Sequence, residues 1–476
     1  MKKIVIGFAV LVALLVVAPW GIGKLAEKRI DHGLAKLTEL APYLKVVENK
    51  YTTGWFKSEQ VVTFEAFGPW MEALNQVMKK APDAVPPPEE AAALPELPLR
   101  FTVRNEILHG PVLGLSGLGI ARVDSHLVLS DKVRKEIAEI FGPKDPFEIS
   151  TRVGFFGGGT TTFKSEGRTI KPRKEEKVEL TWETFKVAVG YSHNVDTFYI
   201  DGKWPKFEAK NTADNSYFVM TDMTMEGDAK RARGDLYDGE VQFGIAKAAA
   251  IGKEAFELQD LSVTEIVETK DDFTGVSMRM GSGELRAKEL TSMGIALKEV
   301  HFDIGVRRLH TPTLAKTVAD MKAIYATPLT NMAEVDQVML APFKESGAEL
   351  LKYDPEFVIE RIGIATADGD GYIKGLVTLK GATAEDFGSG SMGLIGKIHA
   401  DLTIDVSEKM IQKFPNGSTG AGAAVDSGYA KREGDRLICK IVFSKGQLTV
   451  NGKPQGIPGL GGPPPGGIEE VPAPQE

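Results

Sequence analysis

Alternation between apolar and polar residues recurs along most of this 476-residue chain, and it limits the available folds more than any other feature. Between Ala121 and Leu129 the odd-numbered positions are apolar or small, whereas Arg122, Asp124 and His126 take the even ones. A period of two is typical of β-strands with one buried face. The same pattern predicts further strands at 147–155, 178–189, 257–267, 276–285, 295–306, 357–365, 372–379, 397–406 and 436–443.

Turn dipeptides and two helical stretches complete the predicted fold. Asp-Gly or Asn-Gly pairs at 201–202, 238–239 and 451–452 are typical of tight antiparallel hairpins. Thr311-Pro312 opens a helical pattern that ends before Pro328, and a second runs from Thr330 to Tyr353. The chain is therefore predicted to be α+β and mostly antiparallel β, with a two-helix insertion at 311–353.

An uncharged, mostly apolar run of twenty residues extends from Ile4 to Gly23, behind Lys2 and Lys3. Such a run is long enough to cross a hydrocarbon core as one helix. A cleaved signal peptide is the alternative, but Pro19 directly follows the only small-residue cleavage site. We therefore expect an uncleaved N-terminal transmembrane helix, with basic residues on both sides that leave its orientation open.

The remaining chain divides by composition. Residues 24–45 carry an apolar stripe at helical spacing and are predicted to form a helical stalk. A long β-rich body follows over residues 46–451, interrupted by a Pro-rich loop at 81–98. The Pro- and Gly-rich segment 452–476 has too few apolar residues to fold and is predicted to be a disordered tail.

Charge and motifs exclude several function classes. The chain has 57 basic and 65 acidic residues, a net charge of −8, which argues against a nucleic-acid partner. Cys439 is the only cysteine, so no intramolecular disulfide forms. The sequence contains no phosphate-binding, zinc, redox or hydrolase signature, and we expect no cofactor, no metal and no catalytic residue of the usual kinds.

Two histidines stand in informative contexts. His193 lies close to Asp196 without a nucleophile beside it, and a polar turn is the favoured interpretation. His109, with Gly110 and Pro111, ends a predicted strand in a compact turn, where the imidazole either bonds the turn backbone or acts as a general base. The first interpretation is favoured.

Four motifs, in this order and spacing, resemble the YdgA-like family of Gram-negative envelope proteins. They are Y-x-x-G-x-F-x-S at Tyr51 to Ser58, NEILHGP at Asn105 to Pro111, LKYDPEFVI at Leu351 to Ile359, and GQLTVNGK at Gly446 to Lys453. The resemblance implies an inner-membrane anchor with the body in the periplasm. It implies no activity, since the family is a domain of unknown function.

The first two motifs supply the candidate ligand-binding or structural residues. These are Tyr51, Gly54, Phe56, Ser58, His109, Gly110 and Pro111. Aromatic bulk beside a glycine is typical either of ligand stacking or of a core corner where the stalk joins the sheet, and the corner is the favoured interpretation.

Two function classes follow from these observations. The first is a non-enzymatic envelope protein, anchored through residues 4–23, whose sheet binds an apolar or lipid ligand or an envelope protein partner. Its motivation is an excess of strands with an apolar face over helices that could cover them, although sheet-on-sheet packing satisfies the same pattern. The alternative is an envelope enzyme whose active site is assembled from distant residues.

Overall fold

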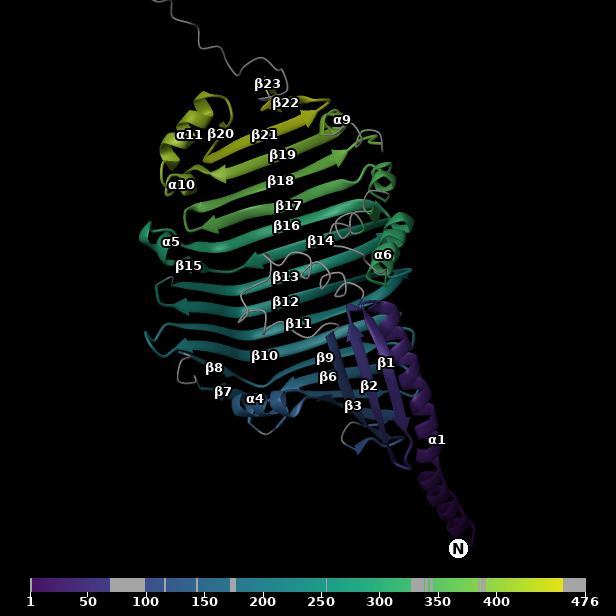
Figure 1. The fold of residues 1–476 in the computed structure, drawn as a ribbon. Helices are drawn as coiled ribbons and strands as arrows, with labels where there is room; N and C mark the ends of the chain where they lie inside the picture. Colours follow the sequence, from purple (N-terminus) through teal and green to yellow (C-terminus); the bar gives the residue numbers. More distant parts are fainter. Residues whose placement is uncertain are drawn as a thin grey trace, which may run out of the picture. The chain divides into compact units, whose positions relative to one another are not determined.

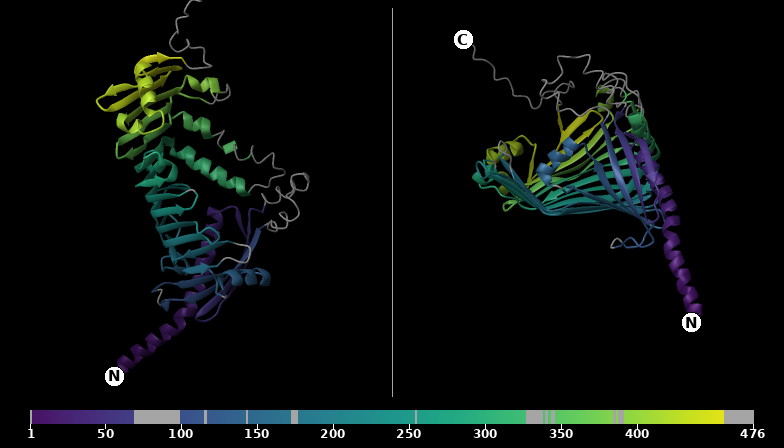
Figure 2. Two further views of the ribbon diagram at one scale, coloured as in Figure 1. Left: turned by 90° about the vertical axis from the view of Figure 1, so that its left-hand side faces the viewer. Right: turned by 60° about the horizontal axis from the view of Figure 1, so that its bottom comes forward.

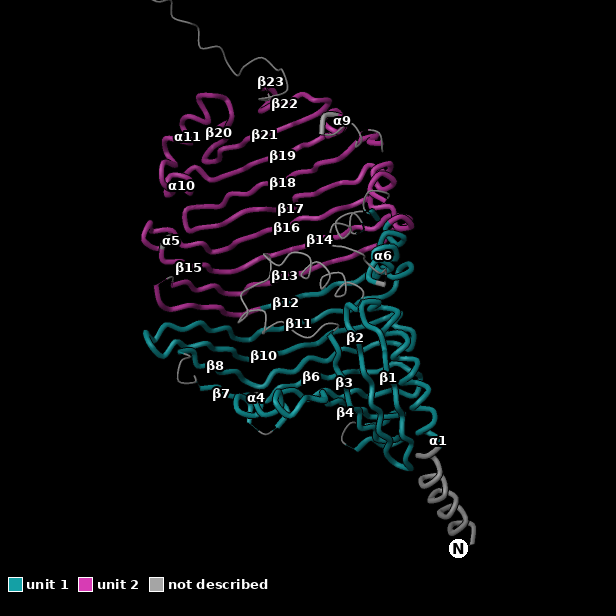
Figure 3. The backbone as a smooth tube through the Cα atoms, in the orientation of Figure 1, with its two compact units in different colours: residues 1–244, 314–345 teal, residues 245–313, 346–476 magenta. Residues whose placement is uncertain are grey.

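The computed structural model describes residues 2–68, 99–114, 117–142, 144–171, 177–253, 255–326, 338, 341–342, 346–383, 386 and 391–456, with the side chains of the first helix described from Gly21 onward. These residues form two compact units, one of residues 1–244 with 314–345 and one of residues 245–313 with 346–476 (Figure 3). Figure 1 labels the helices and strands.

The first unit holds one long helix and most of the shorter strands. Its elements are α1 (Lys2–Leu40), β1 (Leu44–Thr52), β2 (Lys57–Ala66), β3 (Leu99–His109), β4 (Ala121–Val128), α4 (Asp131–Phe141), β5 (Glu148–Val153), β6 (Gly159–Ser165), β7 (Arg168–Ile170), β8 (Val178–Trp182), β9 (Phe185–Tyr191), β10 (Thr197–Asn211) and β11 (Tyr217–Arg233). Most of α6 (Thr311–Ala326) also belongs to it, and the boundary between the units falls within β12 (Leu236–Ile251).

Neighbouring strands of this unit are antiparallel in every described pair. They follow the order β1, β2, β3, β4, β5, β6, β9, β10 and β11. Strand β8 pairs with the other half of the β10 edge and carries β7 beside it. The single strand predicted at 178–189 is therefore two strands, β8 and β9, which both pair with the longer β10.

The neighbouring strands of the second unit are also antiparallel in the described pairs. Its elements are β13 (Phe256–Lys270), β14 (Phe273–Ser282), β15 (Leu285–Ala287), α5 (Lys288–Ser292), β16 (Leu297–His310), β17 (Glu356–Thr366), β18 (Gly369–Leu379), α9 (Ser391–Ile395), β19 (Ile398–Ser407), α10 (Glu408–Ile411), α11 (Gly417–Asp426), β20 (Lys431–Glu433), β21 (Arg436–Ser444), β22 (Gln447–Val450) and β23 (Lys453–Gln455). Strands β16, β17, β18, β19 and β21 lie side by side, as the views in Figure 2 show from teal to yellow.

Helix α1 runs without interruption through the predicted boundary between anchor and stalk. Within the described part of the chain, no helix combines the length and apolar character that crossing a membrane requires. This finding contradicts our prediction of a transmembrane helix at residues 4–23, and with it the predicted location as a single-pass inner-membrane protein. From Gly21 onward, Ile22, Ala26 and Ile30 of α1 pack on the sheet of the same unit, whereas Leu25 and Leu37 are exposed.

The core of the first unit lies between α1 and strands β3, β4 and β5. Ala26 of the helix is fully buried against a cluster that includes Ile107, Ala121 and Val153. A small residue at position 26 allows the helix to approach the sheet closely, and the strands place their apolar residues on the facing side. The predicted stalk therefore packs on the sheet through Ala26 and Ile30, and the helix continues to Leu40.

Two of the predicted hairpin turns are wrong. Gly202 lies inside β10, where it pairs with Met225, and Gly239 lies inside β12. A Cβ atom on Gly239 would come 2.6 Å from Cα of Ala229, so the glycine permits close backbone approach instead of a turn. The third pair is a turn, because Asn451 and Gly452 have φ values of 51° and 81° between β22 and β23.

Other predicted boundaries also shift. The alternation at 178–189 splits into β8 and β9, and the first predicted helix of the insertion is observed as α6. Residues 81–98 and most of the second predicted helix lie outside the described residues, although residues 346–351 are helical. Strand β23 extends regular pairing to Gln455, the fourth residue of the predicted tail.

Candidate functional site: a cavity beneath helix α1

The structure brings several of the sequence-predicted residues together near Gly23 of helix α1. Tyr51 lies in β1, Gly54 and Phe56 in the loop to β2, Ser58 in β2, His109 at the end of β3, and Gly110 and Pro111 in the turn that follows. The Ser58 hydroxyl oxygen is 2.8 Å from Nε2 of His109, and the Gly54 amide donates to the same oxygen at 3.3 Å. The side chain of Phe56 is exposed.

The hydrogen bonds fix the tautomer of His109. Its Nδ1 lies 3.1 Å from the Trp55 carbonyl oxygen, which can only accept, so Nδ1 carries the proton. Nε2 is then the acceptor and the Ser58 hydroxyl donates to it. The pair has the relation of a nucleophile to its base, but Ser58 and His109 are 6% and 4% exposed, and neither lines the cavities described below.

The pair acts instead as a buried brace under helix α1. A Cβ atom on Gly23 would lie 2.7 Å from Nδ1 of His109, so only glycine allows the helix to rest on the imidazole. Tyr51 packs beside the same core cluster. Burial raises the pKa of the Tyr51 phenol, which the nearby Ser58 hydroxyl partly opposes.

The turn after β3 is built around close backbone contacts. Gly110 donates its amide to the Ile120 carbonyl at 2.8 Å, and a Cβ on Gly110 would lie 2.9 Å from the carbonyl carbon of Gly119. The peptide bond to Pro111 is cis. Gly110 and Pro111 therefore shape the turn after His109, whose imidazole bonds Ser58 and the Trp55 carbonyl and not the backbone of that turn.

A cavity of about 540 Å³ lies between the C-terminal half of α1 and the strands it crosses. Its apolar lining comes from Ile30, Leu34, Leu37 and Leu40 of the helix, from Val195 of the loop between β9 and β10, and from Phe64, Val103, Val123, Val153, Val189 and Phe198 of the sheet. Pockets that bind small molecules in proteins have volumes of about 300–1,000 Å³ and similar apolar walls. The cavity therefore has the size and lining of a ligand site.

A row of polar side chains crosses the sheet along this cavity. Gln60 donates to Asn49 at 2.8 Å, Asn105 donates to Gln60 at 2.9 Å, and Ser125 donates to Asn105 at 2.7 Å. Asn49 in turn donates to Asp31 of the helix at 3.1 Å. Each amide uses a donor and an acceptor in the row, so their orientations are mutually fixed. The row links four strands and the helix along one side of the cavity.

The polar lining continues on the next strands. The hydroxyls of Thr151 and Thr161 are 2.9 Å apart. Tyr191 lies beside them, and burial raises the pKa of its phenol, while a hydrogen bond with Thr161 opposes the shift. The phenol is therefore a neutral group of the cavity wall that can donate or accept a hydrogen bond.

One end of the cavity carries nitrogen groups. Nη1 of Arg29 lies 3.2 Å and 3.1 Å from the two ring nitrogens of His193, and His32 stacks on His193 with ring centroids 4.5 Å apart. A guanidinium only donates, so His193 must be neutral at the nitrogen that accepts. A Cβ on Gly157 would lie 2.8 Å from Nη1 of Arg29, and this glycine, with φ of 89°, allows the cluster to close.

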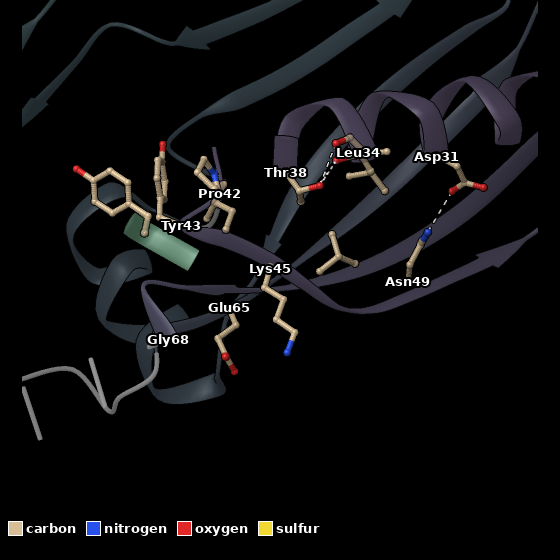
Figure 4. A pocket seen from close by; sticks show the side chains of 13 residues that line it. Asp31, Leu34, Thr38, Pro42, Tyr43, Lys45, Asn49, Glu65 and Gly68 are labelled. Carbon is tan, nitrogen blue, oxygen red and sulfur yellow. Dashed lines mark hydrogen bonds between the residues drawn. The ribbon is translucent and has the colours of Figure 1, made fainter. Parts of the chain in front are cut away.

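A second cavity of about 630 Å³ borders the opposite side of the helix (Figure 4). Its lining includes Asp31, Lys45 and Glu65, and Figure 4 shows Asp31 pointing toward Asn49. This second cavity is lined by both signs of charge. By contrast, the lining of the 540 Å³ cavity contains no carboxylate.

The second unit has an apolar hollow of its own, of about 430 Å³. Its lining includes Met280, Phe302, Ile364, Ile404 and Met410, on β14, β16, β17, β19 and α10. It is more open than the cavity beneath α1 and holds fewer groups that could orient a ligand. We regard the cavity beneath α1 as the candidate site.

Two further results bear on this assignment. No cluster of three or more histidine, cysteine, aspartate or glutamate side chains that could hold a metal ion occurs in the described part of the chain.

A family described as a bacterial protein of unknown function (DUF945) matches residues 1–457. The chain belongs to this family. Comparisons with curated proteins and with solved structures returned no match, so a function for this DUF945 chain depends on the chemistry of its site.

Sequence reasoning missed the residues that line the cavity. Gln60 shares the inward face of β2 with Ser58 and Val62, and a buried glutamine on such a face was a usable signal. Arg29 and His32, three residues apart on α1, share a helix face. The partner of this pair, His193, is 161 residues from His32 in sequence, and no local pattern joins them.

Proposed function

We propose that this chain is a non-enzymatic binding protein that holds an apolar ligand in the cavity beneath α1. The observation that carries the proposal is the cavity of about 540 Å³, lined largely by apolar side chains of a helix and a sheet and edged by an ordered polar row. Apolar walls supply affinity through removal of surface from water, and a few fixed polar groups orient the ligand. The narrower likeness to YdgA-like proteins belongs to the same proposal and adds no activity.

A second candidate function is an enzyme, and one observation favours it. Ser58 and His109 are held at hydrogen-bond distance, with the tautomer of the imidazole fixed by a carbonyl. Against it, both side chains are almost completely buried, and helix α1 rests on the ring. A substrate would have to displace the helix to reach the serine.

Filling the cavity tests the binding proposal. Val189 of β9 lines the cavity, and its neighbour Ala188 does not and lies on the opposite face of the same strand. We expect the purified full chain to bind N-phenyl-1-naphthylamine, an apolar dye whose fluorescence rises out of water. Val189→Trp should weaken this binding at least tenfold, whereas Ala188→Trp, the matched control, should retain it.

Circular dichroism spectra identify variants that remain folded. If the wild-type chain shows no saturable dye binding, or if the two tryptophan variants bind equally well, the cavity beneath α1 is not the binding site. A second, weaker class of sites that survives in Val189→Trp would be assigned to the apolar hollow of the other unit.

A further inference from the structure

The ligand's polar head can be inferred from the nitrogen groups at one end of the cavity. Arg29 forms no ion pair with any carboxylate among the described residues, and its hydrogen bonds run from Nη1 to His193. A guanidinium is always charged at physiological pH and is costly to bury without an anion. This cation therefore lines an apolar cavity with only a neutral imidazole beside it.

Two buried nitrogen atoms at the same end lack a partner. They are Nε of Arg29 and Nε2 of His32, each inaccessible to solvent and without a hydrogen bond. Buried polar atoms without a hydrogen-bond partner are rare in folded proteins, and each calls for an explanation. With Nη1 directed to His193, the remaining edge of the guanidinium, Nε and Nη2, is the edge that matches two oxygens of one oxyanion.

The charges around the cavity favour the same sign of ligand. Its ionisable lining residues are Arg29, His32, Lys36, Tyr191 and His193, and none of them is an acid. Lys36 pairs at 2.6 Å with Glu39, which does not line the cavity. An anion entering this space would meet no carboxylate on the wall, in contrast to the second cavity with its Asp31 and Glu65.

We propose that the cavity beneath α1 binds a single-chain amphiphile whose compact oxyanion head, a carboxylate or a phosphate, is held by Arg29 and His32, while its alkyl chain lies along the apolar wall. This inference rests on the proposed binding function and names its ligand class. The head accepts from Nε of Arg29 and from His32, and the chain contacts Leu34, Val123 and Val189. Glycine at position 157 leaves the room in which Arg29 and His193 meet.

Displacement of the bound dye by amphiphiles measures separately how the head group and the alkyl chain contribute to affinity. Dodecanoate, dodecyl phosphate and 1-dodecanol, each below its micelle or solubility limit, are titrated against dye bound to the full chain. We expect at least one of the two anions to bind tenfold or more tightly than dodecanol, because a charge-assisted hydrogen bond in a dry site discriminates by at least this factor. The stronger of the two anions identifies the head as carboxylate or phosphate.

Charge-neutral variants then test the role of Arg29. Arg29→Gln should lower the affinity for the preferred anion at least tenfold and leave dodecanol binding unchanged. Lys28→Gln removes one positive charge in the same way from an exposed neighbour outside the cavity and should alter neither. Arg29→Lys keeps the charge but loses the bidentate edge, and we expect it to fall between wild type and Arg29→Gln.

The outcomes distinguish the two proposals. If dodecanol and the anions bind wild type equally, or if Arg29→Gln and Lys28→Gln behave alike, the oxyanion site is refuted while a purely apolar ligand remains supported. If neither the dye nor any of the three amphiphiles binds wild type, the proposed binding function itself fails. If Arg29→Gln does not fold, Arg29→Lys and its preference between anion and alcohol decide the question.

Discussion

Two glycines on helix α1 make a matched test of how the helix packs. Replacing a glycine inside a helix by alanine stabilises the helix by about 1 kcal/mol, because alanine loses less conformational freedom on folding. At Gly33 an added Cβ would meet no atom within 4 Å. We therefore expect Gly33→Ala to stabilise α1 by up to about 1 kcal/mol.

The same substitution at Gly23 should have the opposite sign. Its Cβ would lie 2.7 Å from Nδ1 of His109, and overpacking of a core costs about 1–3 kcal/mol. A displaced imidazole would also lose its hydrogen bonds to Ser58 and to the Trp55 carbonyl, each contributing about 1 kcal/mol. After subtraction of the helical gain of about 1 kcal/mol, Gly23→Ala should destabilise the region by about 2–4 kcal/mol.

Hydrogen exchange measured by mass spectrometry on peptides from α1, β2 and β3 reports this difference locally, without assuming that the two units unfold together. His109→Ala removes the ring that the new methyl group would meet, so the penalty of Gly23→Ala should largely disappear in the double variant. If Gly23→Ala slows exchange as much as Gly33→Ala does, the helix does not rest on His109, and the description of the brace is wrong.

Three further predictions concern other parts of the chain. Burial alone would raise the pKa of Asp235, but the contacts of this carboxylate with Lys322 at 2.8 Å and with Arg231 lower its pKa overall. The ionised carboxylate therefore stabilises the fold fully above the unfolded pKa of about 3.9, and this stabilisation is lost as the pH falls through the lower folded pKa. Asp235→Asn should therefore lower the urea midpoint at pH 7, by up to about 1 kcal/mol in free energy, and this difference should vanish near pH 2. Ser58→Ala should cost about 1–3 kcal/mol by leaving a buried ring nitrogen unpaired, while neither it nor wild type reacts with a fluorophosphonate probe; labelling of wild type alone would revive the enzyme hypothesis. Asn451 has φ of 51° and makes three side-chain hydrogen bonds, so in thermal melts Asn451→Ala should be less stable than Asn451→Gly by about 1 kcal/mol, with both below wild type.

The sequence predicted strands best where alternation is uninterrupted. The predicted segments at 121–129, 357–365, 372–379 and 436–443 correspond to β4, β17, β18 and β21 within a few residues. Alternation is a local property, since each side chain takes its face from its neighbours along the same strand. Turns were harder to predict than strands. Gly202 and Gly239 were predicted in turns but lie within strands. The sequence alone does not distinguish a glycine that permits close approach of two backbones from one that permits a turn.

Composition was misleading at the N-terminus. An uncharged apolar run behind two lysines predicts a membrane helix, yet no helix in the described part of the chain meets the requirement for crossing a membrane. Hydropathy measures how apolar a segment is and does not report which surface covers it. The packing of Ala26 against the sheet could not be read from the sequence, because the strands that bury it begin about eighty residues later.

What the sequence determined by itself is the set of strands with one apolar face, whereas the structure shows that the Tyr51–Ser58 and Asn105–Pro111 motifs lie on the neighbouring strands β1, β2 and β3. Only the tertiary structure decided that Ser58 and His109 form a closed brace and that an open cavity lies further along the same helix. The cationic end of that cavity joins Arg29 and His32 to His193, and the polar row joins residues from four strands. Such contacts depend on how a helix crosses a sheet and on strand register, which long-range packing sets and no short segment encodes.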